Sequence, residues 1–153
     1  MAVAFRNVEL GQGTPLEHWP YEALVTVIER GTVGDWARLT RAIRREPWGE
    51  VARQVEEYLG QAQPWGVGPL LQRAVDAARA EAERSERETV ARHVTDLIAR
   101  SGLSQAEFAQ RIGTSASRLS TYRTGAVVPS AALVVRMELL SARLSGVAAD
   151  RLG

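Results

Sequence analysis

Cysteine and lysine are both absent from the 153-residue sequence. Without cysteine, the chain can form no disulfide bond, no thiolate zinc site and no cysteine nucleophile. This composition fits the reducing environment of the cytoplasm. Because lysine is absent, all 19 basic side chains are arginines, whose planar guanidinium groups suit phosphate well.

Long apolar runs are also missing. No stretch approaches the roughly 18 to 20 apolar residues needed to span a bilayer, and residues 1–15 lack the basic segment and apolar core of a secretion signal. We therefore expect a cytoplasmic protein with no membrane partner. An apolar content of 45% and a net charge of only +1 indicate a globular chain.

Signals of catalysis or metal binding are scarce. The two histidines, His18 and His93, have no second ligand or base at metal or catalytic spacing. The Gly-x-Gly pairs at 11–13 and 66–68 are too short for a phosphate loop, and no strand pattern precedes them. We expect no catalytic residue, metal or cofactor, and we interpret His93 with Asp96 as an exposed ion pair on a helix.

Residues 105–125 predict two short helices joined by a tight turn. Ser104 and Glu107 form a Ser-x-x-Glu capping box that starts the first helix near Gln105. Gly113 suits a left-handed cap at the end of that helix, and Ser115 can cap the second helix.

The second helix of this pair has few charges on its outer face. Leu119 and Tyr122 share the inward face, which leaves small side chains exposed at positions 116, 117, 120 and 121. Short hydroxyl and methyl groups let a backbone approach base edges, whereas Arg118 and Arg123 supply charge for phosphates. The spacing alone also fits any helical hairpin with a glycine turn.

This stretch resembles the lambda-repressor-like (XRE or Cro-type) helix-turn-helix family. Eleven positions match the family pattern in register: Ser104, Gln105, Phe108, Ala109, Ile112, Gly113, Ser115, Leu119, Ser120, Tyr122 and Gly125. The resemblance extends to a preceding helix that includes Leu97 and to a following helix that opens at Pro129-Ser130, and covers about residues 88–144.

The resemblance implies that the second helix enters the major groove of double-stranded DNA. Gln105, Ser115 and Thr124 would then contact the DNA backbone. Bases would be read by Ala116, Ser117 and Thr121, and the remaining expected DNA contacts are Arg118, Ser120 and Arg123. Two positions depart from the pattern: Arg123 stands where many members have glutamate, and the base-reading positions lack the glutamines of several phage repressors.

Charge is distributed unevenly along the chain. Residues 1–87 carry 11 arginines and 13 acidic residues, whereas residues 88–144 carry seven arginines and four acidic residues, a net charge of +3. The positive excess therefore lies on the expected DNA-binding segment. Because it is modest, we expect affinity to depend on dimerisation or on well-placed contacts.

The N-terminal part contains all four tryptophans, at positions 19, 36, 48 and 65. Apolar spacing predicts helices over 20–30, from a cap at Asp35 to residue 45, and over 48–59, with Gly31 and Gly60 closing the first and third. We expect a helical domain over residues 1–68. Its tryptophans fit either a dimerisation or partner-docking surface or a tryptophan-rich core.

Residues 69–101 read as one long helix, because no glycine follows Pro69 before Gly102 and the middle is rich in Ala, Arg and Glu. Residues 69–87 would connect the two domains. The alternative is a break near Ser85. Residues 145–153 are expected to fray.

We therefore expect an all-α protein with an N-terminal helical domain, a long connecting helix and a C-terminal lambda-repressor-like helix-turn-helix domain. The favoured interpretation is a homodimeric transcriptional regulator that reads a palindromic operator through the helix at 115–124 and represses its own gene. The alternative is an antitoxin-like protein whose N-terminal domain neutralises a toxin while the helix-turn-helix represses the operon. A purely structural adaptor is a third possibility.

Overall fold

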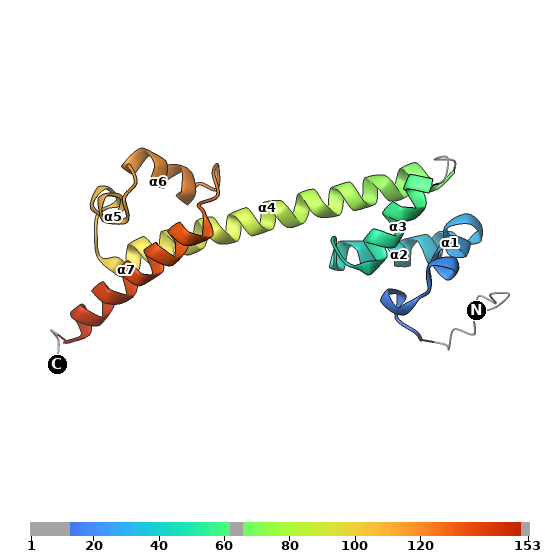
Figure 1. The fold of residues 1–153 in the computed structure, drawn as a ribbon, viewed down its shortest axis with the longest axis horizontal. Helices are drawn as coiled ribbons and strands as arrows, with labels where there is room; N and C mark the ends of the chain where they lie inside the picture. Colours follow the sequence, from blue (N-terminus) through green and yellow to red (C-terminus); the bar gives the residue numbers. More distant parts are fainter. Residues whose placement is uncertain (1–12, 62–65, 151–153) are drawn as a thin grey trace. The chain divides into compact units, whose positions relative to one another are not determined.

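The computed structural model describes residues 13–61 and 66–150, and the side chains of 147–150 are not considered. The described part of the chain is helical and contains no strand, which confirms the expected all-α class. The elements in chain order are the short 3-10 helix η1 (Leu16–His18), α1 (Tyr21–Arg30), α2 (Val33–Arg45), α3 (Glu50–Gln61), α4 (Gly68–Ser101), α5 (Gln105–Ile112), α6 (Ala116–Arg123) and α7 (Ala131–Asp150) (Figure 1).

The chain divides into two compact units, residues 1–82 and 83–153. The first unit therefore extends beyond the boundary expected at residue 68. The reason is that Leu71, Val75 and Ala78 of α4 are buried in its core. The first part of the expected connecting segment thus belongs to a packed domain.

Aliphatic side chains from four helices build the first core. Leu24 and Ile28 of α1, Leu39 and Ile43 of α2, Val51 and Val55 of α3, and Leu71 and Val75 of α4 are all buried. Burial of this apolar area is the main driving force for folding of the unit.

The tryptophans of the first unit have different surroundings. Trp19 is buried, and its indole Nε1 donates a hydrogen bond to the carbonyl of Thr14 at 3.0 Å. Trp36 packs against the core and donates to Val27 O at 3.1 Å, whereas Trp48 is 48% exposed. Trp65 lies outside the described residues. Two of the four therefore serve the core.

The ends of two helices differ from the sequence prediction. The cap of α2 is Thr32, whose hydroxyl accepts from the Asp35 backbone N–H, while the Asp35 carboxylate accepts from Thr32 N at 2.9 Å. Asp35 is thus the fourth residue of a capping box and not the cap itself. Helix α3 begins at Glu50 and continues through Gly60 to Gln61, so Gly60 does not close it as predicted.

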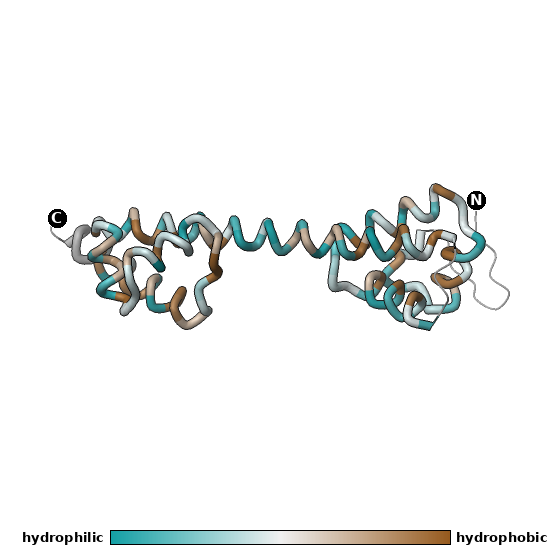
Figure 2. The backbone as a smooth tube through the Cα atoms, turned by 90° about the horizontal axis from the view of Figure 1, so that it is seen from above, coloured by the Kyte–Doolittle hydropathy of each residue, from teal (hydrophilic) through white to brown (hydrophobic). Residues whose placement is uncertain are grey.

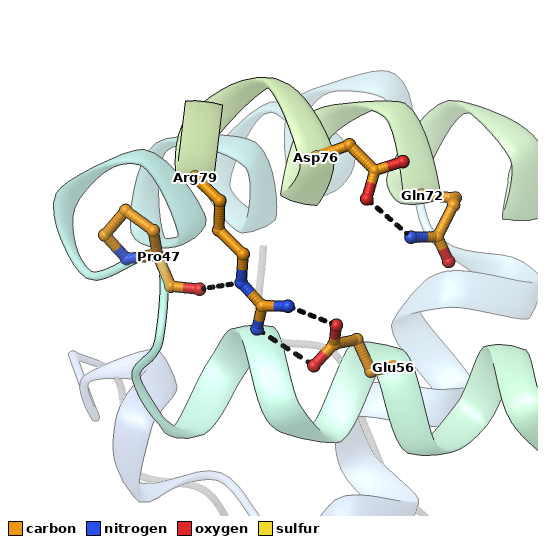
Figure 3. A network of polar contacts seen from close by, with 5 residues as sticks. All are labelled: Pro47, Glu56, Gln72, Asp76 and Arg79. Carbon is orange, nitrogen blue, oxygen red and sulfur yellow. Dashed lines mark hydrogen bonds and ion pairs between the residues drawn. The ribbon is translucent and has the colours of Figure 1, made fainter. Parts of the chain in front are cut away.

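Arg79 of α4 fastens this helix to α3 and to the loop before it (Figure 3). Its guanidinium makes a two-pronged ion pair with Glu56, with 2.9 Å between Nη2 and Oε2, and its Nε donates to Pro47 O at 3.0 Å. The hydrogen bonds that Arg79 donates to Glu56 raise the pKa of Arg79, so the pair stays charged. On the same helix, Gln72 donates to Asp76 at 2.9 Å.

Helix α4 continues without a break through Ser85, whose carbonyl accepts from the Thr89 hydroxyl at 2.8 Å. The alternative of a break near Ser85 is therefore wrong. Figure 2 shows hydrophilic residues throughout the middle of this helix, and residues 83–89 are exposed. A stretch with no apolar face keeps its helical form through the high helix propensity of Ala, Arg and Glu.

The second core gathers side chains from the last part of α4 and from α5, α6 and α7. Phe108 lies at its centre, fully buried, with Val94, Leu97, Ile112, Leu119, Tyr122, Met137 and Leu140 around it. The expected start of α7 is confirmed, since Ser130 Oγ accepts from Leu133 N at 3.2 Å. Helix α7 continues to Asp150, beyond the expected end at 144, and the Ser145 hydroxyl lies 3.2 Å from Arg100 O.

Candidate nucleic-acid interface

The first helix of the candidate interface, α5, starts with the predicted capping box. Ser104 Oγ accepts from Glu107 N at 3.3 Å, and the Glu107 carboxylate accepts from the Ser104 backbone N–H at 2.9 Å and from its hydroxyl at 2.7 Å. These hydrogen bonds lower the pKa of Glu107. The box fixes the point at which the chain turns into α5.

The turn after α5 depends on Gly113. This residue has φ +79° and is the left-handed C-cap, as predicted, and the next amide, Thr114 N, donates to Ala109 O at 2.9 Å. Arg136 of α7 completes the cap, since its Nη1 donates to Ile112 O at 2.8 Å. A cation at the C-terminus of a helix also complements the helix dipole. The turn is thus held from two sides.

Helix α6 is oriented by its inward face. Ser115 caps it by accepting from Arg118 N at 3.1 Å, and Leu119 and Tyr122 are buried in the second core. These features confirm the predicted cap and the predicted inward pair. The opposite face of α6 is therefore left to solvent.

Gln105 joins the start of α5 to α6. Its Nε2 donates to Ala116 O at 3.1 Å, and its Oε1 accepts a hydrogen bond from Arg123 Nη1. Arg123 and Gln105, both expected to contact DNA phosphate, are thus brought together in the free protein. The Gln105 side chain thus links the start of α5 to the first and last residues of α6.

The hydroxyl groups on and beside α6 differ in whether their donor hydrogen is free to bond to a ligand. Thr121 is half-buried and donates to Arg118 O at 2.7 Å, and Thr124 donates to Thr121 O at 3.2 Å. Because a hydroxyl has one donor hydrogen, these two threonines offer acceptor lone pairs and methyl groups to a ligand. Ser117 and Ser120 are exposed and make no side-chain hydrogen bond to any other described residue.

Ala116 and Arg118 complete the exposed face of α6. Ala116 is exposed at the first position of the helix. Arg118 is exposed too, and its Nε donates to the Tyr122 hydroxyl at 3.2 Å, which directs the guanidinium along the helix. Eight of the nine residues predicted to meet DNA therefore lie on α6 or at its two caps, and the ninth, Gln105, lies at the start of α5.

The segment after α6 contains features that the sequence prediction missed. Val127 N donates to Thr121 O at 3.2 Å, and the side chains of Val127 and Val128 are 45% and 51% exposed. Gly125 has φ +75°, and a Cβ there would lie 3.7 Å from Ala91 of α4. This loop thus presents apolar side chains beside α6.

His93 has a different partner from the one predicted. Its Nε2 lies 2.8 Å from Glu138 Oε1 of α7, not beside Asp96. This contact joins α4 to α7 and links residues that are 45 positions apart in the sequence. Over the described ranges, no group of three His, Cys, Asp or Glu side chains is placed to hold a metal ion.

Comparison with known proteins identifies a family for the second unit. The family model described as a helix-turn-helix domain matches residues 71–152, more than half of the chain. The chain belongs to the helix-turn-helix domain family. Membership of this family indicates a DNA-binding protein. No curated protein and no solved structure matched the chain.

The match of the helix-turn-helix domain includes all of α5, α6 and α7, together with most of α4. Residues 1–70, with α1, α2 and α3, lie outside it. Among the helices formed by the described residues, none combines the length and apolar character needed to cross a bilayer.

Proposed function

We propose that this protein is a sequence-specific transcriptional regulator whose α6 reads base edges in the major groove. One observation carries the proposal: α6 exposes the hydroxyls of Ser117 and Ser120, which bond to no other described side chain or backbone group, while Leu119 and Tyr122 fix its other face in the core. Small polar groups on a rigidly held helix suit direct readout of bases, because the helix backbone can approach the groove closely.

The lambda-repressor-like resemblance assigns a role to each remaining contact. Gln105, Ser115 and Thr124 meet the sugar-phosphate backbone, and Arg118 and Arg123 add charge-assisted contacts to phosphates. Ala116, Ser117 and Thr121 read base edges. The bond between Gln105 and Arg123 supports this assignment, because it places an amide and a guanidinium side by side at the start of α5.

We further propose that the protein binds DNA as a homodimer through an apolar strip on α7, here called the α7 seam. The seam consists of exposed residues at alternating spacings of three and four: Ala132, Val135, Leu139, Ala142 and Gly146. Val135 and Leu139 are 50% and 61% exposed. This spacing is typical of two helices that pack along a common seam.

A homodimer suits the proposed readout of DNA. Two copies of a small helix-turn-helix domain bind two half-sites about 34 Å apart, so the operator would be palindromic. Bound upstream of its own gene, such a dimer blocks transcription. The protein would act where the chromosome lies, in the cytoplasm.

The proposed readout is tested by selecting duplexes from a random-sequence pool with the full-length protein. Selection should enrich one palindromic sequence, and Ser117→Glu should abolish enrichment by placing a negative charge on the reading face. The matched control is Ser85→Glu, which adds the same charge to an exposed serine in the middle of α4. Enrichment that survives Ser117→Glu, or no enrichment at all, would contradict the proposal.

An antitoxin role is the second candidate. It is favoured by a first unit that has its own core, lies mainly outside the family match and exposes Trp48 and Leu70, the latter to 59%. Such apolar side chains can serve a partner protein. A toxic gene next to this one, whose product binds the full-length protein and is silenced by it, would establish this role.

A further inference from the structure

Three arginines of the first unit form a basic cluster on α2, outside the region of the family match. Arg38, Arg41 and Arg45 follow one another at spacings of three and four residues, so their side chains leave one face of the helix. Together with Leu16 and Ala42 they line an open cleft of about 500 Å³. We call these three residues the α2 arginine patch.

The structure restricts two of these side chains before any ligand arrives. The Arg38 guanidinium lies 5.6 Å from the centre of the Trp19 ring, and the Trp19 indole is itself tied to Thr14 O at 3.0 Å. Arg41 Nε donates to Ala37 O at 3.4 Å. Because a held side chain loses less entropy on binding, this arrangement favours recognition of an anion.

Acidic neighbours neutralise the patch only in part. Glu17 lies 3.7 Å from Arg45 Nη2, but the two side chains are 40% and 68% exposed, so the pair is weak and a phosphate can displace it. Asp35 interacts electrostatically with Arg38, yet its carboxylate is held by hydrogen bonds from Thr32, which lower its pKa. Positive charge thus remains available in the cleft.

We propose that the α2 arginine patch binds the phosphate backbone of duplex DNA, as a second contact beside the helix-turn-helix domain. At the rise of an α-helix, Arg38 and Arg45 are separated by about 10 Å along the axis, the axial span of about three phosphates of one strand. Such contacts are independent of base sequence.

An acidic protein surface is the competing ligand. Duplex DNA is favoured because the same chain carries a helix-turn-helix domain, and linking two binding surfaces in one chain makes the second binding event intramolecular. Only this choice of ligand rests on the proposed function.

The test measures binding of the full-length protein to a labelled duplex of arbitrary sequence at a series of salt concentrations. The patch variant is Arg38→Gln/Arg41→Gln/Arg45→Gln. If each arginine neutralises one phosphate, the slope of log K against log salt should become shallower by about two to three. The measurement is repeated with Ser117→Glu present, so that the remaining binding reports on the patch when α6 is disabled.

The matched control is Arg30→Gln/Arg53→Gln/Arg73→Gln, which removes the same charge from exposed arginines elsewhere in the first unit. This control should change the slope by less than about one. Equal slopes for the patch and control variants would overturn the proposal.

A charge-preserving variant separates binding from folding. Arg38→Lys/Arg41→Lys/Arg45→Lys should keep the wild-type slope, because lysine also neutralises phosphate. A slope lost in this variant as well would trace the effect to damage of the first unit and overturn the proposal. So would patch-dependent binding to poly-glutamate with unchanged binding to DNA, which would assign the patch to an acidic protein.

The two proposals fail separately. Sequence enrichment by α6 is expected to persist in the patch variant, since backbone contacts carry no base information. If the patch and control variants have equal salt slopes while enrichment is intact, only the patch proposal is refuted. If the wild type shows no enrichment while the patch variant still has a shallower salt slope than the control variant, only the proposed readout by α6 is refuted.

Discussion

The side chains of α6 divide between those that hold the helix in place and those left to meet DNA. Arg118 and Thr121 belong to both groups, because each makes one hydrogen bond within the helix and keeps further capacity. Arg118 retains its terminal guanidinium nitrogens, and Thr121 retains its acceptor lone pairs and methyl group. These two residues therefore allow phosphate contact and base readout to be separated.

Replacing these two residues should have different effects on DNA binding. Arg118→Gln should weaken binding to all sequences and make the salt slope shallower by about one. Thr121→Val should leave the slope unchanged but alter the preferred base at one position, with a discrimination change of about 1–3 kcal/mol. Titration of duplexes that differ at each operator position measures both. Equal effects of both variants on every duplex would contradict the assignment of roles.

Gly113 should tolerate no other residue without a cost in stability. Gly113→Ala should lower the free energy of unfolding by about 1–2 kcal/mol, because φ +79° places a Cβ in a left-handed conformation. Gly60→Ala is the contrast: nothing lies within 4 Å of the added methyl and the residue is helical, so stability should rise by about 0.5–1 kcal/mol. Chemical denaturation monitors both. Equal shifts would argue against the cap.

The Glu107 cap should make stability depend on pH in the acid range. Because Ser104 lowers the pKa of Glu107 in the folded state, this contribution is complete above the usual value of 4.5 and is lost as the pH falls through the folded-state pKa. Glu107→Gln should therefore show a smaller loss of stability on acidification than the wild type. Denaturation curves of the wild type and of Glu107→Gln, recorded across the acid pH range, test this prediction. Parallel pH profiles would show that the carboxylate contributes nothing.

At the scale of elements, α4 takes part in two cores. Its first turns pack Leu71 and Val75 into the first unit, and its last turns pack Val94 and Leu97 into the second. Arg79 lies where α4 leaves the first core and meets α3. The polar contacts of Arg79 therefore hold α4 against α3 at the point where α4 leaves the first core.

Removing the Arg79 contacts should destabilise the first unit. Arg79→Ala leaves Glu56 and Pro47 O without their shared donor, and the Arg79 side chain is only 26% exposed, so the expected loss is about 1–3 kcal/mol. Gln72→Ala, which removes a single bond within α4, should cost less than about 0.5 kcal/mol. Thermal unfolding followed by tryptophan fluorescence reports on this unit. A loss for Arg79→Ala no larger than the control would refute the role of the network.

The α7 seam makes a prediction about oligomeric state. Leu139→Glu should convert the proposed dimer into a monomer in sedimentation experiments, because a carboxylate would be desolvated in an apolar contact. Ala131→Glu adds the same charge at the first residue of α7, outside the seam, and should leave the dimer intact. A wild-type protein that sediments as a monomer, or a Leu139→Glu variant that remains dimeric, would contradict the seam.

At the scale of the whole molecule, local interactions could be predicted from the sequence and distant ones could not. The Ser104–Glu107 box, the Gly113 cap and the Ser115 cap involve neighbours within five residues, and all three predictions are confirmed. The N-cap is harder to predict where two nearby residues can both serve. In α2 the cap is Thr32, although Asp35 is also a residue type that caps helices.

The missed features all join distant parts of the chain. Arg136 caps α5 from 24 positions away, and His93 pairs with Glu138 across 45 positions. Helical periodicity predicts which face of each helix points inward. It does not predict which polar side chains of two helices come into contact. For the same reason, the sequence does not show that Leu71, Val75 and Ala78 belong to the first core, since an uninterrupted helix gives no signal where its packing changes.

The most direct test of the account is equilibrium binding of the full-length protein to a duplex from upstream of its own gene, compared with a scrambled duplex of equal length. We expect the protein to prefer the natural duplex at both low and moderate salt, with total affinity falling as salt rises. Ser117→Glu should remove the preference. Equal binding to both duplexes, or a preference that persists in Ser117→Glu, would contradict the claim that α6 reads DNA sequence.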